Sequence, residues 1–126
     1  HGVELLAGIK VDPRFGPVIS VGMGGIYVEI FKQVAVALAP ASEDQVCELI
    51  ASLPGAALLT GARGRPALDI KAAAKVITTL ADIACRHRHE LESLEINPLL
   101  VLKDQAIALD ARAILNRDNP ENRRVA

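Results

Sequence analysis

The chain has 126 residues, 51% of them hydrophobic, and a formal net charge of −1 at pH 7. This length fits one ordinary domain with its own core, and the hydrophobic content excludes disorder over most of the chain. The near-neutral charge and the 2% aromatic content exclude the basic surface and the stacking platform of a nucleic-acid-binding protein. No apolar run is long enough to span a membrane and no signal peptide opens the chain, so we expect a cytoplasmic protein.

The first third of the chain predicts strands separated by turns. Val3–Val11 and Pro17–Val21 have strand composition, and the segment between them is rich in turn residues, which predicts a hairpin. Ile26–Phe31 alternates in side-chain character and predicts a third strand, and Val34–Leu38 predicts a fourth. Because the strand pattern starts without any lead-in, we expect the chain to be a fragment of a larger protein.

The middle of the chain predicts two helices. Ser42 and Gln45 form a capping box that opens the first, and Pro54–Gly55 ends it. Asp69 can cap a longer helix that runs to about His89. Strands, two helices and further strands in this order predict an α+β domain, with a mixed or antiparallel sheet and both helices on one face.

The last two strands predict the most specific site. Counting outward from a turn centred on Lys103–Asp104 places Asn97 directly opposite Asp110. Opposed side chains on one face have Cβ atoms about 4.5–5.5 Å apart, so two side-chain oxygens there could share one cation. Mg²⁺ suits such a pair because it takes few protein oxygens and leaves its other positions to water and phosphate. The same register pairs Glu95 with Arg112 as a salt bridge.

A purely structural interpretation of the same pair stays open. Asparagine before proline is a common turn signal, and Asp110 could simply end a strand. Against this, Ala106–Leu109 is apolar on both faces, which predicts a buried strand. A carboxylate beside a buried strand needs a partner or a cation.

Three other features allow two interpretations each. Gly22–Gly25 could bind a phosphate through its backbone amides, or it could simply make a turn. The turn is favoured because the segment lacks the spacing of known phosphate loops. Glu29, on a predicted strand, is either functional or part of an exposed face. Arg63 lies between glycines, where it could bind an anion or only be solvated.

Histidine and cysteine do not predict a catalytic or metal centre. His87 and His89 are two residues apart, so on a helix they point in different directions and are expected at the surface. Cys47 and Cys85 stand alone in apolar helical contexts and are expected to be reduced core thiols. We therefore assign no catalytic residue.

Taken together, six segments carry a resemblance to a known family. The chain resembles the C-terminal part of the ATP-grasp domain of NDP-forming acyl-CoA synthetases, also called ADP-forming acetate–CoA ligases. It is similar, more distantly, to the β subunit of succinyl-CoA synthetase. The resemblance runs from residue 3 to residue 115. The segments, in order, are Glu4–Gly8, Asp12 with Phe15–Pro17, Gly24–Glu29, Leu59–Gly64, Glu95–Leu99 and Leu109–Arg112.

The resemblance implies a function. The family interconverts acyl-CoA, ADP and phosphate with the carboxylic acid, CoA and ATP, and it carries the phosphoryl group on a histidine. By resemblance, Asn97 and Asp110 bind the Mg²⁺ that accompanies the nucleotide phosphates, whereas Glu29, Arg63 and Asp12 lie near the nucleotide cleft.

The resemblance also predicts what the chain lacks. Residues 2–115 would form the ATP-grasp C-terminal subdomain, followed by a polar tail at residues 116–126. Its partners would be the remaining ATP-grasp half and the CoA-binding domains, and the fragment alone is expected to be inactive. The alternative is a regulatory, non-catalytic ATP-grasp-like module of an acyl-CoA-synthetase-like protein acetyltransferase.

Overall fold

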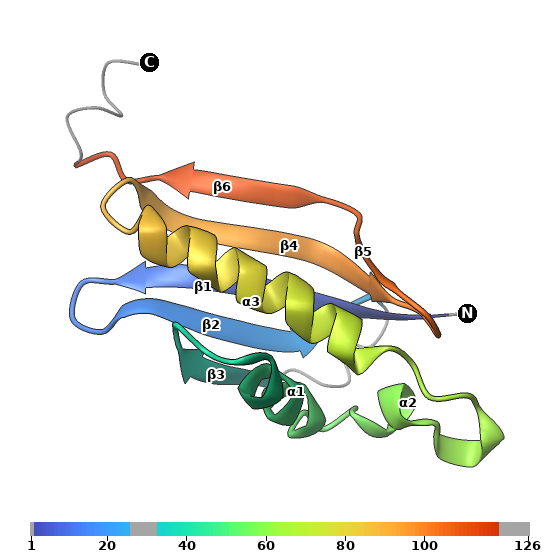
Figure 1. Ribbon diagram of the computed structural model, residues 1–126. Helices are drawn as coiled ribbons and strands as arrows, with labels where there is room; N and C mark the ends of the chain where they lie inside the picture. The colour runs from blue at the N-terminus through green and yellow to red at the C-terminus, as the bar shows by residue number, and fades with distance from the viewer. Residues whose placement is uncertain (1, 26–32, 119–126) are drawn as a thin grey trace.

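The computed structural model describes residues 2–25 and 33–118 and shows one sheet covered by helices on one side (Figure 1). All strand pairings among the described residues are antiparallel, in the order β3-β2-β1-β4-β5, and β6 follows β5 along the same edge of β4. The strands are β1 (Val3–Asp12), β2 (Gly16–Met23), β3 (Val34–Leu38), β4 (Leu91–Val101), β5 (Ala106–Ala108) and β6 (Ala111–Leu115).

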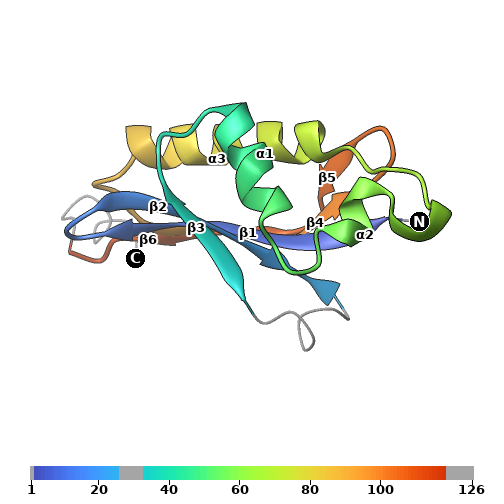
Figure 2. The ribbon, with the colours of Figure 1, turned by 90° about the horizontal axis from the view of Figure 1, so that it is seen from below.

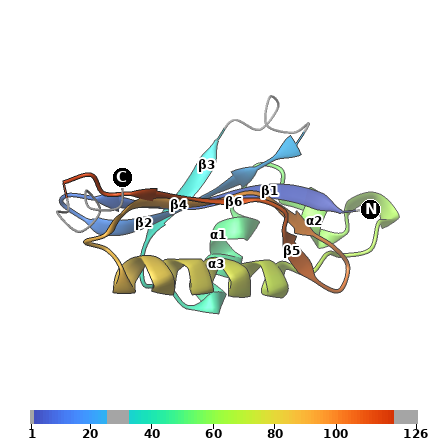
Figure 3. The same ribbon diagram turned by 90° about the horizontal axis from the view of Figure 1, so that it is seen from above.

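The two longer helices lie on the same face of this sheet, as the turned views show (Figures 2 and 3). The predicted α+β architecture, with a sheet and two helices on one face, is therefore confirmed. A short helix and a 3-10 turn connect the two long helices. In chain order the helices are α1 (Glu43–Ala51), α2 (Ala57–Thr60), η2 (Ala62–Gly64) and α3 (Ile70–Arg86).

Side-chain caps explain where the long helices begin. The Ser42 hydroxyl accepts from the Gln45 amide at 3.1 Å, and the Gln45 side chain accepts from the Ser42 amide at 2.8 Å, so the predicted capping box forms. Asp69 caps α3 by accepting from the Ala72 amide at 3.0 Å. The Asp69 N–H also donates to the carbonyl of Leu102, which ties the start of α3 to the end of β4.

The far end of α3 differs from the sequence prediction. The helix ends at Arg86 rather than near His89, because the following residues form a turn. The amides of Glu90 and Leu91 both donate to the carbonyl of His87. This turn leads directly into β4, the strand that contains Asn97 of the predicted metal pair.

The core lies between the helices and one face of the sheet. Along β1 the buried residues alternate, with Val3, Leu5, Ala7 and Ile9 directed toward the helices, and Ile77 of α3 is fully buried against this layer. The intervening residues of each strand therefore point to the opposite face, which no helix of the described chain covers (Figure 3). We call this uncovered side the open face.

Two strand predictions need correction. The second strand does not end at Val21 but runs on through Met23, so the glycine-rich segment starts inside it. The segment Ala106–Leu109 is not a buried strand: Ala106 is half-buried, the next three residues are exposed, and Leu109 is 55% exposed. It lies at the edge of the sheet, where no further strand covers it among the described residues.

Some predictions fall outside the described residues. The predicted strand Ile26–Phe31 lies there, as does most of the predicted polar tail.

Both cysteines are free and half-buried, Cys47 on α1 and Cys85 on α3. Burial raises the pKa of the Cys47 thiol, and Asp44 and Glu43 raise it further. Within the described chain, no helix is long and apolar enough to cross a membrane.

Candidate metal and phosphate site

A bulge in β4 places Asn97 on the open face. Between β1 and β4, Leu5 pairs with Leu99 but Ala7 pairs with Ile96, so β4 holds one residue more than β1 in this interval. Both Ile96 and Leu99 are buried against the helices. A bulge commonly redirects one side chain, and here it leaves Asn97 exposed between two core residues.

The predicted register of the last two strands is confirmed. The Asn97 amide donates to the Asp110 carbonyl at 3.0 Å, so the two residues are cross-strand partners. Leu102 and Gln105 close the turn as expected, with the Leu102 amide donating to the Gln105 carbonyl at 2.8 Å. Asp110 lies between β5 and β6, the two short strands that pair one after the other with β4.

The two side chains line one small hollow on the open face. Its volume is about 170 Å³, and its lining consists of Glu95, Asn97, Asp110, Ala111 and Arg112. A whole small-molecule ligand usually occupies about 300–1,000 Å³, so this hollow fits only part of one, such as a metal ion with a phosphate group.

The donor set fits a hard divalent cation that keeps other ligands. Asn97 offers an amide oxygen and Asp110 a carboxylate, and both are exposed on one edge of the hollow. No group of three or more His, Cys, Asp or Glu side chains arranged for a metal occurs in residues 2–25 and 33–118. The pair of oxygen donors is compatible with Mg²⁺, which often uses one or two protein ligands plus phosphate and water.

The neighbouring charged pair is only partly as predicted. Glu95 and Arg112 are cross-strand partners, but no ion pair joins them within the described residues. Both side chains instead border the hollow. Sequence reasoning treated Arg112 only as a salt-bridge partner and missed it as a site residue. The signal was available, because Asp110 and Arg112 are two apart on a strand and share a face.

Asp12 is not brought together with this pair. It ends β1 at the hairpin, whereas Asn97 lies in the β4 bulge opposite the interval from Leu5 to Ala7, nearer the other end of β1. The Asp12 carboxylate accepts from the amides of Arg14 (2.7 Å) and Phe15 (3.0 Å), and these hydrogen bonds hold the pKa of that carboxyl below its ordinary value. In the described chain Asp12 thus serves the turn.

None of the other candidate residues is placed at the hollow by the part of the chain that the structure describes. Glu29 and the side chain of Arg63 lie outside the described residues, although the Arg63 backbone belongs to η2. Gly24 donates its amide to the carbonyl of Glu4, so this part of the glycine segment serves strand pairing. His87 is exposed and lies 3.2 Å from Glu90.

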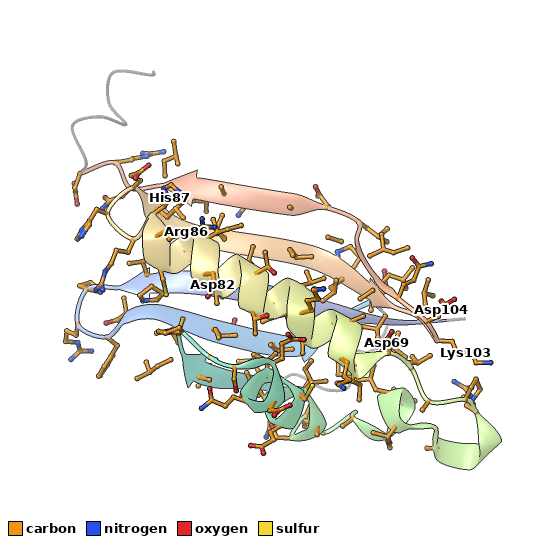
Figure 4. All side chains as sticks on the ribbon, viewed as in Figure 1. Asp69, Asp82, Arg86, His87, Lys103 and Asp104 are labelled. Atoms are coloured by element: carbon orange, nitrogen blue, oxygen red, sulfur yellow. The ribbon has the colours of Figure 1, made fainter. Side chains whose placement is uncertain are left out.

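A larger hollow of about 550 Å³ lies elsewhere, between α3 and the β4–β5 turn. Its lining is mainly apolar, with Lys75 on the helix side and Asp104 on the turn side. Figure 4 shows Asp104 beside Lys103 near the start of α3, at the opposite end of the helix from Arg86 and His87. This hollow exceeds the open-face hollow in volume, but it does not bring together the oxygen ligands that a metal and phosphates need.

The fold agrees with the comparison to known families. A family-wide sequence model of the ATP-grasp domain matches residues 1–115, and the chain belongs to this family.

Among curated relatives, the β subunit of acetate–CoA ligase [ADP-forming] I from Pyrococcus furiosus is 39% identical over 114 residues. That alignment covers 90% of this chain and 49% of the relative. The 4-hydroxybutyrate–CoA ligase [ADP-forming] of Nitrosopumilus maritimus is 41% identical over 102 residues, covering 81% of this chain and 14% of the relative. The predicted resemblance to ADP-forming ligases is thus confirmed, and the chain spans about half the length of the β subunit it matches.

Solved structures give the same result. The dinucleotide-forming acetyl-coenzyme A synthetase 1 of Candidatus Korarchaeum cryptofilum, in complex with coenzyme A and Mg-AMPPCP, superposes with a TM-score of 0.83 at 34% identity. The match covers 92% of this chain and 54% of that one. In that complex the phosphohistidine segment points towards the nucleotide-binding site.

Proposed function

We propose that this chain is the part of an ADP-forming acyl-CoA ligase that holds the metal ion and the outer phosphates of the nucleotide. The full reaction would convert acyl-CoA, ADP and phosphate to the carboxylic acid, CoA and ATP. The relatives that support this activity are ligases of that type. The observation that carries the proposal is the opposed pair Asn97 and Asp110 on the rim of one small hollow.

The two residues would act as fixed oxygen ligands. Their backbones are joined by the 3.0 Å hydrogen bond, so the strand pairing, rather than a mobile loop, sets the spacing of the side chains. Asp110 supplies the negative charge and Asn97 a neutral oxygen. Mg²⁺ bound there would neutralise charge on the nucleotide phosphates during phosphoryl transfer. The chain's own task is to orient that assembly on the open face.

The rest of the active site would come from elsewhere in the full-length protein. A hollow of about 170 Å³ cannot enclose a nucleotide, and the open face lacks a cover within the described residues. The remaining ATP-grasp half would supply the opposite wall. Domains that bind CoA and the acyl group would complete the enzyme.

The test is Asp110→Asn in the full-length protein. The change keeps the shape of the side chain but removes its charge, so ATP formation at saturating Mg²⁺ should fall by about a hundredfold or more, since loss of metal stabilisation costs several kcal/mol. The melting temperature should stay unchanged because Asp110 is exposed.

Asp82→Asn is the matched control, since Asp82 is an exposed aspartate on α3, which lies on the covered side (Figure 4). It should keep both activity and melting temperature. An Asp110→Asn protein that melts normally and turns over within a few-fold of wild type would refute the metal-ligand assignment. A wild-type protein that binds Mg-nucleotide without any turnover would instead indicate the regulatory module.

A further inference from the structure

We infer that Arg112 binds the phosphate oxygens of the metal-bound nucleotide. The cation would then lie on Asn97 and Asp110, and the phosphate would contact Arg112 in the neighbouring cross-strand pair. This inference rests on the proposed function and extends it to a residue outside the metal pair.

Arg112 lies immediately beside the metal pair. It is two residues beyond Asp110 along the same edge, and both residues border the same hollow. Its cross-strand partner is Glu95, which is itself two residues before Asn97. Successive pairs on one face of an antiparallel ladder are neighbours, so a ligand on the metal pair meets the second pair next.

The guanidinium of Arg112 is available for a ligand. Within the described residues no hydrogen bond or ion pair engages it, even though a carboxylate stands across the strand. The Arg112 side chain is exposed, and Gly8, which has no side chain, lies beyond Glu95 in the same cross-strand row. An arginine fork can bind two phosphate oxygens at once, whereas an exposed pairing with one carboxylate contributes little.

The charges of the hollow favour a cation and an anion together. Two carboxylates, from Glu95 and Asp110, face one guanidinium, so the hollow alone has an excess of negative charge and would repel a phosphate. A divalent cation on the metal pair reverses that excess. The phosphate would then be held between the cation and Arg112, which predicts that phosphate binding depends on both.

A second hollow shows where the rest of the ligand can lie. It has a volume of about 330 Å³ and meets the first at Glu95. Lys10, Ser93 and Ile114 are among its lining residues, and Ile114 is two residues beyond Arg112. Glu95, the cross-strand partner of Arg112, therefore lies at the junction of the two hollows, so a ligand whose phosphate is bound at Arg112 has room to extend into the larger one.

The test measures binding of Mg-AMPPCP, a nucleotide analogue, to the full-length protein by calorimetry, with adenosine as a competing ligand without phosphates. Arg112→Gln should weaken Mg-AMPPCP binding by about tenfold to a hundredfold, the range expected for charged hydrogen bonds. Adenosine affinity and melting temperature should not change. Arg112→Lys should recover part of the loss because lysine keeps the charge but not the fork.

Arg86→Gln serves as the control, because Arg86 lies at the end of α3, which packs on the covered side (Figure 4). Equal Mg-AMPPCP affinity in Arg112→Gln and wild type would overturn the inference. A parallel loss of adenosine affinity in Arg112→Gln would also overturn it. The same holds if Arg112→Gln lowers the melting temperature and Arg112→Lys restores that temperature but not the affinity for Mg-AMPPCP. Failure of the proposed function looks different: Asp110→Asn would then leave Mg-dependent binding unchanged, whatever Arg112 does.

Discussion

The two faces of the sheet are built from the same strands but differ in what they carry. On the covered face, β1 and β2 present fully buried residues such as Leu5 and Ile19, packed under α1 and α3. On the open face, one row of cross-strand partners reads Arg112, Glu95, Gly8 and Ser20. Alternation along a strand therefore separates the residues that stabilise the domain from those that can bind a ligand.

This separation predicts which property a substitution on each face should change. A substitution on the covered face should lower stability and spare the hollow, whereas one on the open face should affect binding and spare stability. The β4 bulge is the point where the two meet, because it keeps Ile96 and Leu99 in the core while directing Asn97 outward. Three substitutions, with expected losses of stability that run from the largest to the smallest, test this separation.

The largest loss of stability should come from Ile77→Ala on α3. Ile77 is fully buried, so the change removes apolar contacts and leaves a cavity, at a cost of about 2–5 kcal/mol in the free energy of unfolding. Urea denaturation measures that loss, with the exposed Asp82→Ala expected to stay within about 0.5 kcal/mol of wild type. At a temperature where the variant is folded, Mg-AMPPCP affinity should be unchanged, and a parallel loss of affinity would contradict the separation of the two faces.

A smaller loss is expected from Ser42→Ala at the start of α1. The variant lacks the hydroxyl that accepts from the Gln45 amide, which should cost about 1 kcal/mol. Ser42→Asp keeps an acceptor at the cap and should retain most of the stability in the same denaturation series. If both variants lose equally, the cap does not contribute through its hydrogen bond.

The smallest effect should come from Asp12 and should depend on pH. Because its pKa in the folded state lies below the ordinary value of 3.8, the charged carboxylate stabilises the fold above that pH, and the contribution disappears as the pH falls through the folded-state value. The difference in melting temperature between wild type and Asp12→Ala should therefore be present at about pH 6 and shrink below 3.8. A difference that grows on acidification would contradict this.

The register of the site could be predicted from sequence because strand pairing is simple arithmetic once the turn is located. The pairings from Leu102 back to Ser93 keep the predicted count, because the bulge near Asn97 shifts the register with β1 only, and the register with β6 shifts beyond Ser93. Both helix starts were also predictable, because each capping residue acts within three positions of itself.

Two predictions that were wrong concern features that depend on residues far apart in the sequence. The apolar run Ala106–Leu109 was predicted to be buried, yet its position at the sheet edge depends on strand order, which local periodicity does not contain. The ion pair between Glu95 and Arg112 was inferred from register alone, although two exposed side chains gain little by pairing. The sequence thus predicted that Glu95 and Arg112 lie opposite each other in the sheet, but it did not predict whether their side chains make contact.

Anomalous diffraction can test directly the proposal that Asn97 and Asp110 hold a divalent cation on the open face. Crystals of the full-length protein grown with Mn²⁺ and AMPPCP would locate the metal independently of any activity. We expect an anomalous peak in the hollow, within about 2.5 Å of the Asn97 Oδ1 atom and of an Asp110 carboxylate oxygen, with phosphate oxygens and water in the remaining positions. A nucleotide-bound metal held by other residues, with both of these side chains directed to solvent, would contradict it.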